Sequence, residues 1–209
     1  SARAKWYVNV GSREDPDFLH DKSLSLLCDG EPKVERLDPS IRAQHVSLSN
    51  GINMPLLGAR IHGSSAESRE TMLAAKVGYT LFDTASDYVR TGRERMLAQQ
   101  FAEGALTRDD VWITTKLHSD NHGFDETLVA AQRSLTALGT TYIDLYMIDG
   151  FKCTKSGGKC GGTWKDSWRA LEKLYADNVV RALGVTGIDA SEMEQLLAWS
   201  SSDIHVAQG

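Results

Sequence analysis

The sequence is poor in the residues that mark membrane, disulfide-rich or nucleic-acid-binding proteins. Its three cysteines cannot all pair with one another and are too few for a disulfide scaffold. No apolar run approaches the ~18 residues of a membrane-spanning helix. With 23 lysines and arginines against 28 aspartates and glutamates, the chain has no basic excess for nucleic acid or anionic lipid. We therefore expect a globular protein of a reducing compartment.

The composition changes near residue 44. Residues 1–44 hold three of the four prolines and 15 charged residues, and they show little apolar periodicity. Such a segment buries too little apolar surface to order itself, so we expect an irregular extension lying on its own domain or on a partner. Residues 45–209 form the second predicted unit. The Ser-Ala start is compatible with removal of a transit peptide, so the compartment is cytoplasmic or the interior of an organelle.

From residue 53 onward, predicted strands and helices alternate about every 30 residues. The strands are expected at 54–61, 79–85, 111–117, 142–149, 180–187 and 204–208. The expected helix caps are Ser64 with Glu67, Asp125, Gly139, Thr163 with Asp166, and Asp189 with Glu192. Repeated strand–helix units predict a parallel sheet covered by helices. Because no glycine-rich phosphate loop follows the first strand, the sequence favours an α/β fold of the (β/α)8 TIM-barrel type, with about six units present.

Polar residues gather where the predicted strands end. They are Asp83, Tyr88, Lys116, Asp149, Thr186 and Gln208. Each alone is more often structural, but the set fits one mechanism. A lysine ammonium beside a tyrosine favours the phenolate and lowers the phenol pKa, and an aspartate keeps the lysine charged and aimed. A tyrosine tuned in this way can protonate a carbonyl oxygen while a nicotinamide delivers hydride to the carbon.

Several motifs carry these residues in a fixed order. They include Phe82-Asp-Thr-Ala-Ser-Asp-Tyr88, Ile113-Thr-Thr-Lys-Leu117, Asp144-Leu-Tyr-Met-Ile148 and Val180-Arg-Ala-Leu-Gly-Val185, after an opening hairpin at 45–58. Together they resemble the aldo-keto reductases. The resemblance implies a (β/α)8 barrel, NADPH as cofactor, and Asp83, Tyr88 and Lys116 as catalytic residues with Tyr88 the general acid. It also implies that Thr186 and Gln208 bind the nicotinamide carboxamide.

The chain departs from the family pattern at several positions. Asp149 stands where the family has a catalytic histidine, and Arg60 and Ile61 replace small residues near the cofactor. An ionised carboxylate about 4 Å from the phenol would oppose phenolate formation by roughly 4 kcal/mol. A protonated Asp149 that donates a hydrogen bond would avoid this, as a glutamate does in the steroid 5-beta-reductases of the family. The sequence also stops one residue after Gln208, before the family's last two strand–helix units.

These departures favour a degenerate aldo-keto reductase that is catalytically impaired and serves as a structural or accessory subunit. Such a protein would have kept or lost the binding of NADPH, the cofactor that the resemblance implies. Other protein subunits would cover the open barrel edge and the extension. The alternative is a working NADPH-dependent aldehyde or ketone reductase seen as a fragment. A third hypothesis is a double-bond reductase that uses protonated Asp149.

Two weaker patterns involve metal-ligating residue types. Cys153 and Cys160 lie in a Gly/Lys-rich loop, and His118 and His122 follow the third large strand. Neither spacing matches a zinc site, so we predict loops and no metal. His118 lies close enough to Lys116 in sequence to suggest that it partly replaces the missing histidine.

Overall fold

The computed structural model describes residues 36–61, 68–85, 93–155, 157 and 159–209. Most of the predicted extension, the Ser64–Glu67 cap and Tyr88 lie outside the described residues. Within the described part, no helix is both long and apolar enough to cross a bilayer.

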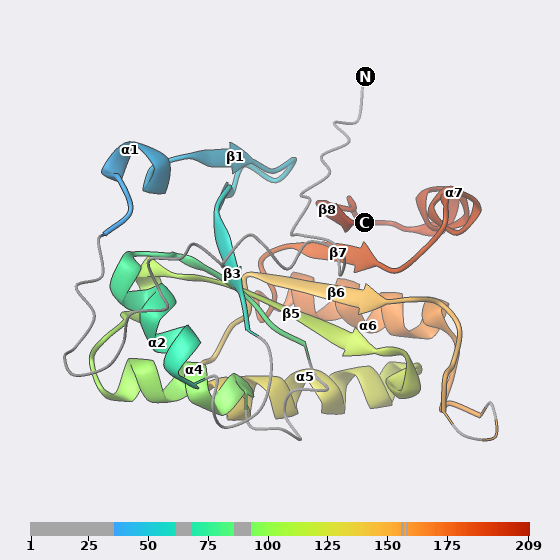
Figure 1. The fold of residues 1–209 in the computed structure, drawn as a ribbon. Coiled ribbons are helices and arrows are strands. Elements are labelled where there is room, and N and C mark those ends of the chain that lie inside the picture. The colour runs from blue at the N-terminus through green and yellow to red at the C-terminus, as the bar shows by residue number, and fades with distance from the viewer. Residues whose placement is uncertain (1–35, 62–67, 86–92, 156, 158) are drawn as a thin grey trace.

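Six strands form one parallel sheet in the order β3-β4-β5-β6-β7-β8 (Figure 1). The strands are β3 (Gly58–Arg60), β4 (Leu81–Asp83), β5 (Trp112–His118), β6 (Leu145–Asp149), β7 (Leu183–Thr186) and β8 (Val206–Gln208). The helices are α1 (Pro39–Arg42), α2 (Ser68–Val77), α4 (Arg93–Ala102), α5 (Phe124–Leu138), α6 (Trp164–Ala176) and α7 (Ala190–Trp199), with short 3-10 turns at Arg108–Asp110 and Ser119–Asn121. An antiparallel hairpin, β1 (His45–Ser47) with β2 (Asn53–Pro55), precedes the sheet. The prediction of an incomplete (β/α)8 fold is confirmed.

Two apolar clusters lie on opposite faces of the sheet. The larger packs outward-facing strand residues such as Phe82, Ile113 and Ile148 against the helices, and α5 and α6 lie side by side on this face (Figure 1). The smaller fills the concave face and includes Leu81, Trp112, Leu145 and Met147, with Leu48 and Met54 from the hairpin region. Because side chains alternate along a strand, residues two positions away from Leu81 or Met147 lie on the same concave face. These include Asp83 and Asp149, the last residues of β4 and β6.

The predicted first strand, 54–61, is wrong as one element. Met54 and Pro55 belong to β2 of the hairpin, and the sheet begins only at Gly58. Leu56 and Leu57 separate the two strands, and the apolar run across them hid the break. The strand predicted at 111–117 is present as β5, shifted by one residue. The other four are present in shorter form, and residues such as Ile143 and Val180 form only an isolated bridge beyond the ladder.

Most of the predicted helix boundaries within the described residues are confirmed. The Asp166 carboxylate accepts from the Thr163 amide (2.8 Å), Asp189 and Glu192 form a reciprocal capping box, and Gly139 ends α5 in the left-handed region. Asp125 is not a cap. The N-cap of α5 is Gly123, at φ 135°, where a Cβ would lie 2.2 Å from the Glu126 carboxylate. The positive φ, which L side chains rarely adopt, therefore favours glycine over an acidic residue at this cap.

Candidate active site

Lys116 and Asp83 form a buried ion pair at the carboxyl ends of β5 and β4. Both residues are almost fully buried, at 7% and 2% exposed. The Lys116 ammonium donates to the Asp83 carboxylate and to the Thr84 carbonyl oxygen (3.2 Å). Burying two charges is expensive unless they pair closely, so the sheet holds the ammonium at one fixed position. The prediction that these two residues lie together therefore agrees with the structure.

Gln208, on the edge strand β8, contacts the same ion pair. Its side-chain amide donates to the second oxygen of Asp83 across 3.4 Å, a long contact, although β8 and β4 are separated by three strands. The sheet is therefore curved enough to bring its second and last strands toward one interior. Thr186 ends β7 opposite Gln208 in the ladder. The two residues predicted to hold the carboxamide are thus neighbours on the concave face.

Asp149 occupies the end of β6, partly buried. It pairs with His118 on one side and with Thr186 on the other in the strand register, whereas Lys116 lies opposite Met147, two residues earlier. A Cβ on Gly187 would lie 3.1 Å from Oδ1 of Asp149, so the carboxylate lies beside the end of β7. The structure brings Asp149 and His118 together on neighbouring strands, and each makes further interactions.

Arg60 adds a basic residue to this edge of the sheet. It is the last residue of β3, exposed, and it lies opposite Asp83 in the register. The predicted general acid, Tyr88, lies outside the described residues, so its distance from Lys116 is not part of this geometry. The described part of the site thus holds two cationic and two carboxylic side chains at the carboxyl ends of four strands.

The sequence analysis missed a third buried carboxyl group, Glu94 of α4. It is fully buried on the helix-covered face of the sheet, where the Thr115 hydroxyl donates to Oε1 (2.9 Å). Burial raises the pKa of Glu94 to about 7, against the opposing effect of the Thr115 hydrogen bond. The spacing of Glu94, Leu97 and Gln100 on one helical face was the signal that could have found it.

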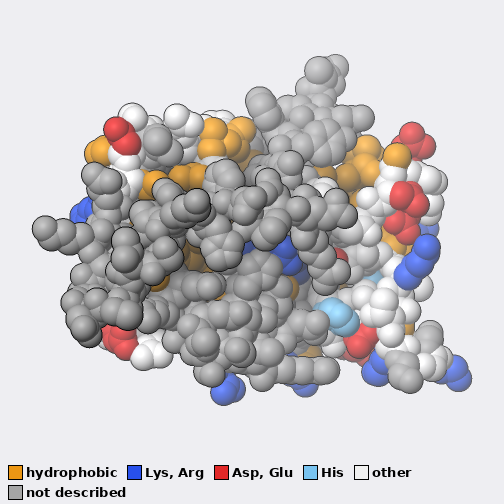
Figure 2. Space-filling model, in the orientation of Figure 1, with side chains coloured by type: hydrophobic (Ala, Val, Ile, Leu, Met, Phe, Trp, Pro, Cys, Tyr) orange, Lys and Arg blue, Asp and Glu red, His pale blue; other side chains and the backbone are white. Residues whose placement is uncertain are grey.

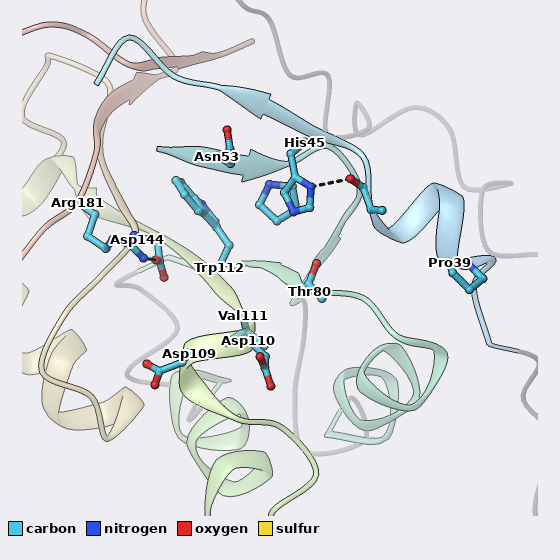
Figure 3. Close-up of a pocket in the computed structure, with 12 residues that line it drawn as sticks. Pro39, His45, Asn53, Thr80, Asp109, Asp110, Val111, Trp112, Asp144 and Arg181 are labelled. Carbon is cyan, nitrogen blue, oxygen red and sulfur yellow. Dashed lines mark hydrogen bonds and ion pairs between the residues drawn. The ribbon is translucent and has the colours of Figure 1, made fainter. Parts of the chain in front are cut away.

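A second missed cluster lies at the opposite end of the strands. Asp144, just before β6, binds Arg108 (2.7 Å) and Arg181 (3.0 Å) and accepts from the Ile113 amide (2.9 Å). It borders a cavity of about 410 Å³ between the sheet and the hairpin, toward which Trp112 points (Figure 3). Chemistry in (β/α)8 folds concentrates at the carboxyl ends of strands, whereas this end serves stability. We therefore assign the Asp144 cluster to the scaffold.

The loop from 150 to 162 differs from the prediction of a flexible segment. Cys153 and Cys160 form a disulfide, with their Cα atoms 6.0 Å apart. His122 is not poised for metal, since Nδ1 contacts the Ser167 hydroxyl (3.1 Å) and Nε2 the Gly150 carbonyl oxygen (3.1 Å). Burial lowers the pKa of His122. No group of three or more candidate metal ligands is found among the described residues.

Comparison with known proteins places this arrangement in a family. The model of the aldo/keto reductase family matches residues 58–208. The chain belongs to the aldo/keto reductase family. Among curated relatives, it is 36% identical over 154 residues to the 9,11-endoperoxide prostaglandin H2 reductase of Trypanosoma cruzi, covering 72% of this chain and 50% of that protein. It is 33% identical over 162 residues to the glyoxal reductase of Bacillus subtilis, covering 76% and 55%.

Solved aldo-keto reductases share the fold. A Bombyx mori aldo-keto reductase in complex with NADP superposes with a TM-score of 0.71 and 26% identity, over 80% of this chain and 58% of that one. An aldo/keto reductase from Brucella melitensis gives a TM-score of 0.68 and 30% identity, over 79% and 62%. The chain therefore spans about half the length of the curated relatives it matches.

Proposed function

We propose that this protein is a reductase of aldehydes or ketones that uses NADPH, with Tyr88 as the proton donor. The observation that carries the proposal is the buried Lys116–Asp83 pair at the carboxyl ends of β5 and β4. Relatives named as reductases support the reaction type, and the solved Bombyx mori relative holds NADP. A pseudoenzyme would have no need to keep a desolvated ammonium at this position.

The hydrogen bonds of Lys116 suit the support of a proton donor. An ammonium has three N–H donors, and Asp83 and Thr84 accept two of them. The third would donate to the Tyr88 phenol oxygen and favour its phenolate form, which makes the phenol a better acid toward a carbonyl oxygen. Asp83 keeps the ammonium charged. Lys116 would act through its fixed positive charge, so it would not have to gain or lose a proton during the reaction.

The residues present fit a nicotinamide carboxamide in part. Thr186 offers a hydroxyl and Gln208 a side-chain amide; the two are register partners, and Gln208 contacts Asp83. When bound, the cofactor would supply the hydride. Arg60 is the residue that fits least, because its long side chain starts at the same edge of the sheet. Its exposed guanidinium has room to turn outward.

The strand register separates Asp149 from Lys116 along the sheet. Its register partner is His118, so its Cα lies two residues further along the sheet than the Cα of Lys116. Its carboxylate lies beside Gly187. A carboxylate held toward β7 opposes phenolate formation less than one in direct contact, because the repulsion falls with distance.

The test is turnover of the full-length protein with NADPH and a small aldehyde, followed by nicotinamide absorbance. We expect Tyr88→Phe to lower kcat by about 10²- to 10⁴-fold, as loss of a general acid does, and Lys116→Met to act in the same direction. Tyr79→Phe, which removes a phenol outside the site, should leave kcat unchanged. Equal activity of the Tyr88→Phe variant and the native protein would contradict the proposal.

A second candidate function is that of an accessory subunit, and Asp149 is the observation that favours it. In that case, other protein subunits would cover the outer strands β3 and β8. Asp149→His separates the two functions. If Asp149 impairs an otherwise intact site, the variant should turn over aldehyde where the native protein does not. A native protein that neither binds NADPH nor gains turnover as Asp149→His supports the accessory role. Reduction of an enone at its double bond would instead support the use of a protonated Asp149.

A further inference from the structure

The β6–α6 loop, residues 150–162, carries a cross-link next to the candidate active site. Cys153 and Cys160 are both partly buried and line a cavity of about 760 Å³ together with Phe151, Lys159 and Lys165. The disulfide closes a sequence separation of seven residues. So short a loop gains less from closure than a long one does, because the chain entropy that a cross-link removes from the unfolded state grows with loop length.

The two ends of this loop are held without the disulfide. His122 contacts the Gly150 carbonyl oxygen through Nε2 (3.1 Å), and its own carbonyl oxygen accepts from the Gly162 amide (3.0 Å). Phe151 stacks on Trp164 with ring centroids 4.1 Å apart. Opening the S–S bond would therefore remove one constraint on the middle of the loop and leave both ends in place.

The composition of the loop favours reversible chemistry at these cysteines. Residues 151–162 contain three lysines, at 152, 155 and 159, and no acidic residue. Figure 2 shows basic side chains gathered over this loop, at the lower right of the view. Positive charge beside a cysteine stabilises its thiolate, which makes it a better leaving group in thiol–disulfide exchange. Lys159 stands directly before Cys160.

The middle of the loop is also tied to the strand ends that form the candidate site. The Thr154 hydroxyl contacts the Ser119 hydroxyl (2.7 Å) and donates to the Asp120 carboxylate (2.6 Å), just after β5. The loop itself begins one residue after Asp149. Its conformation is thereby coupled to the ends of β5 and β6, where His118 and Asp149 lie side by side.

We propose that Cys153 and Cys160 form a reversible dithiol–disulfide site whose redox state sets the conformation of the β6–α6 loop. A thiolate of a dithiol reductant attacks Sγ of Cys153, and Cys160 leaves as a thiolate next to Lys159. The second thiol of the reductant then displaces Cys153. Two electrons and two protons pass to the protein, which ends with two thiols, and the reductant ends as a disulfide. Such a site agrees with both a reducing compartment and the observed cross-link.

The test uses the protein with Cys28→Ser, so that the two loop cysteines are the only ones of this sequence that react. The protein is equilibrated in defined ratios of reduced and oxidised dithiothreitol, alkylated with iodoacetamide and weighed by mass spectrometry. We expect a reversible two-thiol transition in the folded protein. Trypsin cleavage after Lys155 and Lys159 should become at least about tenfold faster on reduction, because the freed loop opens locally more often.

The matched control carries Cys153→Ser and Cys160→Ser as well, and its cleavage should match that of the reduced protein in either buffer. A pair that stays bonded in excess dithiothreitol until the protein unfolds would overturn the proposal, as would cleavage that does not change on reduction. An effect on aldehyde turnover rests on the proposed function. The alkylation and cleavage readouts do not, so they decide this site even if the protein reduces no aldehyde.

Discussion

The two ends of the sheet each bury an aspartate against cations, but they satisfy it differently. Asp144, at the amino end, has both oxygens occupied by Arg108, Arg181 and a backbone amide. Asp83, at the carboxyl end, has one short partner in Lys116 and a long contact from Gln208. A saturated network fixes geometry, whereas a sparse one keeps donors available for a ligand. The difference identifies one end as scaffold and the other as the candidate site.

Arg108 shows how the amino end is saturated. Its guanidinium donates to the Thr140 hydroxyl, to the carbonyl oxygens of Val111 and Tyr142, and to Asp144. It also lies 3.8 Å from the centre of the Tyr142 ring. A planar fork with five donors can satisfy more acceptors at once than a lysine ammonium, which has three. The chemistry of the two cations therefore matches the roles of the two ends.

The largest expected effect is at the amino end. Asp144→Ala would leave Arg108, Arg181 and the Ile113 amide without their shared acceptor, and we expect a loss of about 3–5 kcal/mol in the free energy of unfolding. Urea denaturation measures it. The exposed pair of Lys173 with Asp177 (2.8 Å) is the control, since Lys173→Met should change stability by less than about 1 kcal/mol. Similar losses in the two variants would remove the contrast between a buried network and a surface pair.

Glu94 extends the comparison to a buried carboxyl group with no cation. Its pKa is raised from 4.5 to about 7 in the folded protein, so the unfolded chain releases the proton first as the pH rises. Stability should therefore fall by up to about 3 kcal/mol between about pH 4.5 and 7, then level off. In Glu94→Gln, which keeps an acceptor for Thr115, stability should not fall over this pH range. Urea denaturation at pH 5 and pH 8 measures this difference in stability. The control is Glu103→Gln, at an exposed position, which should show the same fall as the native protein.

The smallest stability effect is expected at the carboxyl end, from the double variant Asp83→Asn with Lys116→Met. Replacing both members of a buried ion pair is often neutral, so we expect a change within about 1 kcal/mol. Lys116→Met alone should cost more, because it leaves Asp83 buried without its cation. Turnover should be lost in both variants. A double variant as unstable as Asp144→Ala would show that the Lys116–Asp83 pair is scaffold too.

The sequence predicted the order of elements well because local rules govern it. The capping box of Asp189 with Glu192 and the left-handed Gly139 depend on a few neighbouring residues, and both stand where they were expected. The break between β2 and β3 was missed because Leu56 and Leu57 continue the apolar run. The predicted strand 54–61 is interrupted where the chain leaves the hairpin and enters the sheet, and the position of this break depends on tertiary packing.

The candidate site was predicted in part. Asp83 and Lys116 stand at the ends of predicted strands, and the chemistry of their residue types and the family motifs indicated the pairing. The direction of the Asp149 carboxylate toward Gly187 could not be predicted, since it depends on the curvature of the sheet. The same holds for the disulfide of Cys153 with Cys160, because sequence spacing does not specify the distance between two Cα atoms in a loop. The role of Tyr88 as general acid and the division of the chain at residue 44 stay predictions.

The sequence by itself determined the family, the succession of strands and helices, and which side chains stand at the strand ends, because periodicity, capping and motif order are local properties. Only the tertiary structure decided which charges have many partners and which have few among the residues that the structure describes. Lys116, Asp144 and Glu94 differ through partners that come from other strands and helices. Their burial and hydrogen bonding arise from packing across the sheet, which no local pattern encodes.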